Sequence, residues 1–409
     1  MATVTVYHPT PLSLPAVAPV TRTFYDARSH LPGRPALTEA DYEGFERHAV
    51  FHDIYLATDG LRAIGPPLVN LAKEVLPLDV RIIDEYGQPG EQLTHRMTKR
   101  DRVAFHHFAL PAQQRSAPAL SVRIRLANGN ETTFDVRRQQ PKPVFLQFVT
   151  MQKNSPIVWI MDWLTYLAEL GVQRVILYDN GSDNFIELSQ SLAAAPADLD
   201  IILVDWPFAY GPVRSFYNQF SQASQNNHVH QCFANASWVG HFDLDEFLLC
   251  ADGQSLRKRL EQLPGRVGCL RIDSYWMPNL QGAGLDSERL PTIRDFPYRE
   301  KKPRGAAFKY LVRQSALKEA KTHNGLLKFG YFRLRPKPEK LVFMHYKALT
   351  TGWKTYWNRQ VREPVDPDLH VQDRRVFVEL ERIAERRSDV NKLPAKSAVT
   401  VTKKHINRV

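Results

Sequence analysis

The sequence has little cysteine and no long apolar run. Its 409 residues include three cysteines, Cys232, Cys250 and Cys269, and no CxxC pair. Cysteines this far apart predict neither a disulfide framework nor a cysteine-based zinc site. No stretch approaches the roughly 18 apolar residues that a membrane span needs, and the N-terminus lacks the basic-then-apolar pattern of a signal peptide. We therefore expect a soluble protein of a reducing compartment, the cytoplasm.

Internal repeats and compositional bias are also absent. No unit of roughly 20–50 residues recurs, which excludes solenoids and propellers. Hydrophobic residues make up 43% and charged residues 24% of the chain, as in ordinary globular proteins, so the chain is not mainly disordered. At about 150 residues per domain, this length predicts two or three domains.

Positive charge is concentrated toward the C-terminus. Residues 296–409 carry 27 lysines and arginines against 11 aspartates and glutamates, whereas residues 1–295 carry 27 against 32. A basic third beside a mildly acidic body indicates a polyanionic partner: a nucleotide diphosphate, an anionic membrane or a nucleic acid. The alternative is a solvated basic face without a partner.

The chain divides into four parts by pattern. Residues 1–35 are proline-rich and aperiodic, as in an extended arm. Residues 36–140 contain alternating polar and apolar runs joined by the turn Ala127-Asn-Gly-Asn130, a strong hairpin signal. They predict an accessory domain with a small antiparallel β-sandwich. Residues 141–350 predict an α/β domain, and residues 351–409 a basic helical segment.

The α/β prediction depends on strands that alternate with helices. The apolar strand at 144–149 precedes a helical stripe at 157–170 and a strand at 172–178. Further helices are expected at 185–195 and 215–234, and further strands at 201–204 and 238–242. This order predicts βαβ units and a mostly parallel, Rossmann-like sheet with helices on both faces.

The sharpest motif is acidic. The apolar run Trp238-Val-Gly-His-Phe242 leads into Asp243 and Asp245. Alternate side chains of an extended chain share a face, so both carboxylates can point off the carboxyl end of the sheet, where open α/β sheets bind ligands. Two such carboxylates repel each other unless a cation lies between them, and their oxygens suit Mg²⁺ or Mn²⁺. The structural alternative is a solvated acidic turn.

Two weaker features accompany this motif. Asp179-Asn-Gly-Ser-Asp183 follows a strand on the same predicted edge, where an acid can contact the base or ribose of a nucleotide. By itself this segment is ordinary turn chemistry. His345 ends the apolar run Leu341-Val-Phe-Met344, and a histidine in that place is more often part of a core than a ligand.

Together these pieces resemble the GT-A glycosyltransferases of the family 2-like and family 92-like (DUF23-like) group. The resemblance covers about half of the chain, and it is carried by Gln152-Lys-Asn154, Trp159–Trp163, Gly171–Asp183, Trp238–Phe247, Lys309–Arg313 and His345-Tyr346. One departure is that the family often has Asn-Glu where this chain has Asn154-Ser155, so no acid stands at position 155.

The resemblance implies a GT-A fold and a divalent metal, Mn²⁺ or Mg²⁺. It implies transfer of a sugar from a nucleotide-sugar donor, a UDP-sugar, to a hydroxyl of a glycan or lipid-linked glycan. Such an enzyme would serve polysaccharide or lipopolysaccharide biosynthesis and would have no nucleic-acid partner. A divalent cation suits this reaction because the departing diphosphate gains charge when its bond to the sugar breaks.

Roles are carried over residue by residue. The nucleotide and its diphosphate would be contacted by Thr150, Lys153, Asp179, Asp183, Asp243 and Lys309. The metal would be held by Asp243, Asp245 and His345. Asp245 would be catalytic through the metal and the diphosphate. An inverting reaction also needs a carboxylate base beside the acceptor hydroxyl, and the candidates for it are Asp273 and Glu246. A retaining reaction would not need that base.

Two other functions compete with this one. A strand followed by Asp243-Leu-Asp245 also resembles the nucleophile motif of haloacid-dehalogenase-like phosphatases. That motif expects threonine or valine where this chain has Phe247, and it expects a position near the start of its domain. The second competitor is a non-enzymatic protein that binds polyanions or nucleic acid through the basic third, although no RNP, KH or zinc-finger pattern is present.

The segment Arg374–Arg387 favours an amphipathic helix. Val376, Leu380 and Ile383 form an i, i+4, i+7 stripe bordered by arginines. Such a helix can lie on anionic headgroups at the inner face of the membrane. Alternatively, it packs its stripe on the catalytic domain and leaves the arginines in water.

Overall fold

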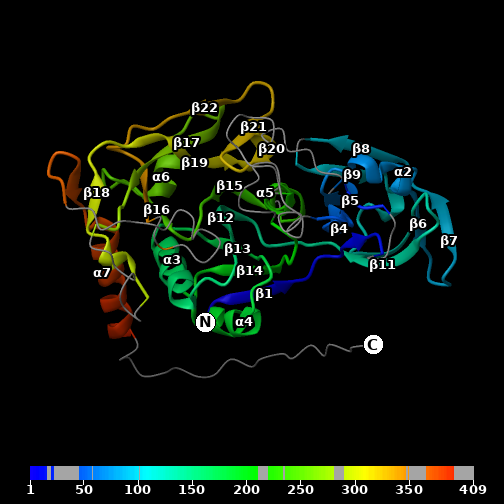
Figure 1. Ribbon diagram of the computed structural model, residues 1–409, viewed down its shortest axis with the longest axis horizontal. Coiled ribbons are helices and arrows are strands. Elements are labelled where there is room, and N and C mark those ends of the chain that lie inside the picture. Colours follow the sequence, from blue (N-terminus) through cyan, green and yellow to red (C-terminus); the bar gives the residue numbers. More distant parts are fainter. Residues whose placement is uncertain are drawn as a thin grey trace.

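The computed structural model describes residues 1–15, 20–22, 46–57, 59–100, 102–210, 220–233, 235–280, 290–346, 349 and 365–390. A large α/β domain occupies one side of the molecule and an all-β domain the other (Figure 1). Within the described ranges, no helix is both long and apolar enough to cross a bilayer.

A ten-stranded sheet forms the α/β domain. Its first half is parallel, in the order β1 (Thr3–Tyr7), β14 (Asp200–Asp205), β13 (Arg174–Asp179), β12 (Val144–Gln152) and β15 (Ala236–His241). Its second half is mixed, and it continues with β19 (Arg304–Arg313), β17 (Val267–Trp276), β23 (Val342–His345) and β16 (Glu246–Leu249). A further strand, β22 (Phe332–Leu334), pairs with β17. The predicted α/β class with a mostly parallel sheet is confirmed.

Helices cover both faces of the sheet, as predicted. On β13, Val175 and Leu177 pack into one apolar cluster with α3 (Ile157–Glu169). The intervening Ile176 and Tyr178 pack into a second cluster with α5 (Phe220–Cys232). Because side chains alternate across a strand, a strand covered on both faces is apolar at every position. Among the described residues this domain also contains the helices α4 (Phe185–Ser191), α6 (Leu256–Glu261) and α7 (Arg375–Val390).

The all-β domain consists of two four-stranded antiparallel sheets. One has the order β4 (Asp53–Ala57), β5 (Gly60–Gly65), β9 (Ala104–Phe108) and β8 (His95–Lys99). The other has the order β11 (Glu131–Arg137), β10 (Ala119–Arg125), β6 (Asp79–Ile83) and β7 (Pro89–Gln92). Apolar side chains of both sheets share one core, so the expected antiparallel sandwich is present. The short helix α2 (Ala72–Val75) packs beside it.

The prediction of an extended arm over residues 1–35 is wrong at its beginning. Residues Thr3–Tyr7 form β1, which pairs in parallel with β14 as the edge of the central sheet. The run Thr-Val-Thr-Val-Tyr has the β-branched and aromatic residues that favour strands. Leu12–Ser13 (β2) pairs with Ala49–Phe51 (β3). The rest of the expected arm lies largely outside the described residues.

The basic C-terminal segment is described only over residues 365–390. Here β24 (His370–Gln372) pairs with β18 (Tyr298–Glu300), and α7 packs on α3. The α7 stripe is buried at Val376 and Ile383, and Arg386 lies 2.9 Å from Glu169 of α3. Of the two alternatives for this segment, the structure therefore shows the helix that packs its stripe on the catalytic domain, and these apolar side chains are not open to a membrane.

Two short strands complete the described β structure. They are β20 (Leu317–Lys321) and β21 (Asn324–Leu327), which form a hairpin beside α5.

Candidate active site

The acidic motif lies in a turn between β15 and β16. The Glu246 N–H donates to the Asp243 carbonyl at 3.0 Å, and the Asp243 N–H donates to Glu246 Oε2 at 2.9 Å. The Asp243 side chain is partly exposed, whereas those of Asp245 and Glu246 are buried. The sequence argument placed both aspartates on an extended strand. Because the chain turns here, their carboxylates instead reach different partners.

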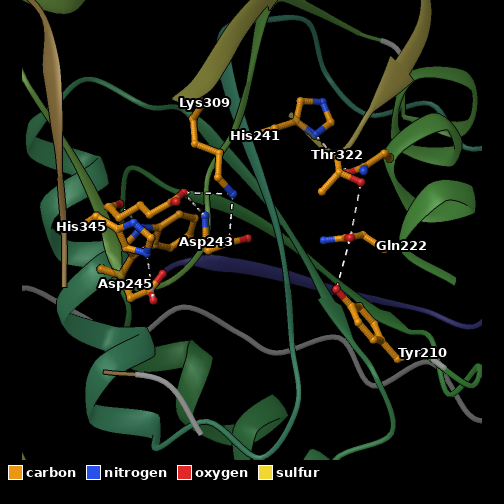
Figure 2. Close-up of polar contacts among 11 residues, drawn as sticks. Tyr210, Gln222, His241, Asp243, Asp245, Lys309, Thr322 and His345 are labelled. Atoms are coloured by element: carbon orange, nitrogen blue, oxygen red, sulfur yellow. Dashed lines mark hydrogen bonds and ion pairs between the residues drawn. The ribbon is translucent and has the colours of Figure 1, made fainter. Parts of the chain in front are cut away.

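Lys309 of β19 forms ion pairs with two carboxylates of the motif, those of Asp243 and Glu246. Its ammonium lies 2.7 Å from Asp243 Oδ2 and 3.1 Å from Glu246 Oε2. Burial alone would lower the pKa of Lys309, but the charges of Asp243 and Glu246 more than offset it and raise that pKa. The lysine therefore stays cationic. Figure 2 shows its side chain descending from β19 toward Asp243.

Asp245 faces His345, the last residue of β23. Asp245 Oδ2 lies 3.5 Å from His345 Nε2, and the two side chains point toward each other in Figure 2. Burial opposes the charged imidazole, yet the carboxylates of Asp245 and Glu246 raise the pKa of His345. Antiparallel pairing of β16 with β23 sets Glu246 opposite His345, and this register brings the three side chains together.

This group has the donor atoms of a divalent-cation site. One ligand atom each from Asp245, Glu246 and His345 lies within 4.8 Å of the others. Two carboxylate oxygens and an imidazole nitrogen suit Mn²⁺, and oxygen donors suit Mg²⁺. Burial raises the pKa of Glu246 to about 7, and a cation nearby would favour its ionised form. The candidate metal group therefore contains Glu246 together with the predicted Asp245 and His345. Asp243, the third ligand predicted from the sequence, is instead paired with Lys309.

The predicted nucleotide contacts lie at the ends of β12 and β13. These strands end at Gln152 and Asp179, which pair with each other across the sheet. Asp179 is buried and accepts hydrogen bonds from the Gln152 amide and from the Ser182 N–H. Asp183 exchanges two hydrogen bonds with Asn154. Both carboxylates therefore hold two loops together at the edge where the acidic motif also lies.

Thr150 and Lys153 differ in their surroundings. The Thr150 hydroxyl is buried, and no hydrogen-bond partner for it is found among the described residues. Lys153 is exposed on the loop that follows β12. The hydrogen-bonding capacity of the Thr150 hydroxyl is thus not used by the described residues. Thr150 lies two residues before Gln152, whose amide donates to Asp179.

Asp273 does not join the acidic group. In the pairing of β17 with β19, Ile272 stands opposite Lys309, so Asp273 points to the other face of the sheet. There its carboxylate accepts from the Arg335 guanidinium, with Nε 2.9 Å from Oδ2. The geometry does not support Asp273 as the base that was expected from the sequence.

A second polar group lies beside Asp243 and was not expected from the sequence. The Tyr210 hydroxyl and the Thr322 hydroxyl both donate to Gln222 Oε1, at 3.2 and 3.5 Å (Figure 2). Burial, followed by the charge of Asp243, raises the pKa of Tyr210, so Asp243 is within electrostatic reach. These residues come from a loop, a helix and a hairpin, and no spacing in the sequence could have connected them.

Comparisons with known proteins return one family. The family model "Glycosyltransferase family 92" matches residues 150–375, more than half of the chain. A glycosyltransferase family 92 protein of Oryza sativa subsp. japonica is 26% identical over 164 residues, which is 37% of this chain and 26% of that protein. Another from Arabidopsis thaliana is 25% identical over 146 residues, 36% of this chain and 23% of that protein. The matches therefore span about a quarter of these curated relatives.

Solved structures show weak similarity. S. aureus TarS 1-349 has a TM-score of 0.27 and 11% identity, covering 59% of this chain and 64% of that one. Glucosyl-3-phosphoglycerate synthase from Mycobacterium tuberculosis, solved with Mn²⁺, UDP-glucose and phosphoglyceric acid, has a TM-score of 0.23 and 14% identity, covering 43% of this chain and 58% of that one. At such TM-scores we draw no conclusion from either structure.

Proposed function

The chain belongs to glycosyltransferase family 92, and on that premise we propose that it transfers a sugar from a UDP-sugar to a hydroxyl of a glycan or lipid-linked glycan. The observation that carries this proposal is the pairing of buried Asp245 with His345 beside the Lys309-bridged Asp243 and Glu246. We place this reaction in the cytoplasm, in polysaccharide or lipopolysaccharide biosynthesis.

In this proposal Asp245 and His345 hold Mn²⁺ or Mg²⁺, with Glu246 as the third group within reach. A bound cation would supply Lewis-acid stabilisation of the charge that develops on the departing diphosphate. The chain's own contribution is to keep these ligands fixed. The Tyr346 N–H donates to the Asp245 carbonyl at 2.8 Å, and the Trp163 indole donates to the Glu246 carbonyl at 3.1 Å.

Lys309 prepares the same region for an anionic donor. By neutralising Asp243 and Glu246 it reduces the repulsion that these carboxylates would exert on a diphosphate. Asp243, which is partly exposed, is the member of the motif that can reach the donor. Glu246 is buried and bonded to its own turn, so we assign it a positioning role and not that of the base.

For the nucleotide we propose contacts with Thr150 and Lys153. The buried Thr150 hydroxyl is a polar group whose hydrogen-bonding capacity is not used by the described residues. Asp179 and Asp183 then act indirectly, because their hydrogen bonds shape the two loops that border the nucleotide. A ligand at this place would lie at the carboxyl edge of the parallel strands, as in other open α/β sheets.

Calorimetry with UDP, GDP and CDP, each with Mn²⁺ and with chelator, tests the donor and the metal together. We expect UDP to bind most tightly and to need the cation. Equal affinity for each nucleotide in chelator would contradict a metal-bridged site. Release of inorganic phosphate from a phosphomonoester, without release of UDP from any UDP-sugar, would favour the phosphatase alternative.

A further inference from the structure

A turn between β21 and β22 projects from the edge of the α/β domain. Gly330 has a φ of +87° at the third position of the turn Lys328–Tyr331, where a type II turn needs a glycine-like conformation. The Tyr331 N–H donates to the Lys328 carbonyl at 3.4 Å, and the Arg333 guanidinium donates to the Gly325 carbonyl at 2.7 Å. These bonds link the end of β21 to the start of β22, and both strands lie in the same upper part of the molecule in Figure 1.

Apolar side chains are exposed along this projection. Phe329 at the tip of the turn is 106% exposed, Phe332 is 47% exposed, and Leu326 and Leu334 are each 38% exposed. Exposed apolar residues that occur singly need no explanation, but a contiguous group indicates an interaction surface. We call Leu326, Phe329, Phe332 and Leu334 the apolar tip.

Basic residues accompany the apolar tip along the chain. Between positions 328 and 340 all five lysines and arginines are exposed, and the only acid is Glu339. They are Lys328, Arg333, Arg335, Lys337 and Lys340. Arg335 is neutralised by Asp273, which leaves an excess of positive charge in the segment 328–340.

We propose that the apolar tip inserts into an anionic lipid bilayer while the lysines and arginines of the same segment contact its headgroups. Aromatic and leucine side chains flanked by lysine and arginine are typical of surfaces that lie in the headgroup region. Long basic side chains can follow the boundary between acyl chains and water. A protein partner fits this surface less well, because lysine is depleted from protein–protein interfaces. The surface is separate from α7, whose stripe is buried.

Vesicle flotation with the full-length chain tests the proposal. Wild type is mixed with phosphatidylcholine vesicles that contain or lack phosphatidylglycerol, at low and at high salt. We expect binding only to the anionic vesicles and its loss at high salt, since screening weakens the headgroup contacts. Phe329→Ser/Phe332→Ser should lower the partition coefficient at least about tenfold, because two aromatic side chains no longer enter the lipid. Lys337→Glu/Lys340→Glu should also release the protein.

Tyr86→Ser is the matched control, because Tyr86 is an exposed aromatic residue on a turn of the all-β domain. It should bind as wild type does, and all variants should keep the wild-type melting temperature because the changed side chains are exposed. Three results would overturn the proposal. They are no binding of wild type to anionic vesicles at low salt, equal binding by the double phenylalanine variant, or a dimer in light scattering that this variant dissociates while vesicles bind neither protein.

Discussion

Lys309 is the residue on which the charge balance of the site depends. It is buried between Asp243 and Glu246, so Lys309→Met leaves Glu246 as a buried carboxylate without its cation. We expect a loss of about 3 kcal/mol in the free energy of unfolding and loss of sugar transfer. Chemical denaturation and a donor-release assay measure the two effects.

The double variant Lys309→Met/Glu246→Gln is the control for that change. A neutral glutamine removes the uncompensated charge, so most of the lost stability should return while activity stays low. If the single variant were as stable as wild type, the ion pair would have no structural role.

His345 and Asp245 carry the metal part of the proposal. We expect His345→Ala to weaken Mn²⁺ binding about 10–100-fold, because one donor atom is removed from the group. Asp245→Asn should act in the same direction and abolish transfer. Mn²⁺ titration by calorimetry measures the affinity, and Asp273→Asn serves as the comparison, since Asp273 lies on the other face of the sheet. Unchanged Mn²⁺ affinity in His345→Ala would assign the ion to another place.

At the scale of elements, the pairing of β8 with β9 brings the buried His106 against the partly exposed His95. His106 Nδ1 lies 3.0 Å from His95 Nε2. Burial, and then the proximity of His95, lowers the pKa of His106 to about 3. In the unfolded chain the pKa of this histidine is near 6.5. Between pH 6.5 and pH 3, His106 is therefore protonated in the unfolded state and neutral in the folded state. The contribution of His106 to stability is full above pH 6.5 and falls as the pH drops toward 3.

We predict that acidification from pH 7.5 to pH 5 removes about 2 kcal/mol through this residue. His106→Gln should show a correspondingly smaller loss over the same interval, although it starts from a lower stability because the buried imidazole is replaced. Urea denaturation of both proteins at the two pH values gives the comparison. The exposed His8→Asn variant should follow wild type. Parallel pH profiles for wild type and His106→Gln would contradict the assignment.

Elements with a clear period could be predicted from the sequence, and those without one could not. The expected helix at 157–170 and strand at 172–178 correspond to α3 and β13 within two residues. By contrast, β19 contains a buried lysine, Lys309, among its apolar residues. A charged residue at a buried position interrupts the apolar pattern from which a strand is predicted. The α7 stripe could not decide between lipid and protein, because one amphipathic pattern serves both.

The site was predictable only in part for a similar reason. The acidic motif and its position after a strand could be recognised in the sequence, and so could His345 at the end of an apolar run. The partner of Asp243 is 66 residues away in sequence, and only the antiparallel insertion of β19 beside β15 brings it near. The turn at residues 243–245 also breaks the alternation that the sequence argument assumed.

At the scale of the whole molecule, a buried polar network joins the two domains. Asp53 of β4 accepts from the Tyr7 hydroxyl at 2.6 Å and lies 2.7 Å from His228 Nε2 of α5. The other ring nitrogen of His228 lies 2.7 Å from the Tyr178 hydroxyl of β13. Asp53 and His228 are both fully buried, so each supplies the other with one hydrogen bond that water cannot replace.

We predict that His228→Phe destabilises the protein by about 3 kcal/mol, because Asp53 would remain buried without one of its partners. Unfolding should also separate into two transitions if the network couples the domains. Differential scanning calorimetry measures both effects. The double variant Asp53→Asn/His228→Phe no longer has a buried carboxylate without its histidine partner, so part of the lost free energy of unfolding should return. A single transition at the wild-type temperature in His228→Phe would show that the network carries no coupling.

The position of β1 has a consequence for the synthesis of the chain. Thr3 pairs with Asp200, so β1 leaves the ribosome nearly 200 residues before its partner strand β14 has been made. At about 5–20 residues per second this delay is about 10–40 s. Meanwhile the all-β domain, whose pairings lie within residues 53–137, can fold first. The pairing of β1 with β14 then forms as a contact of very long sequence separation, which slows its formation.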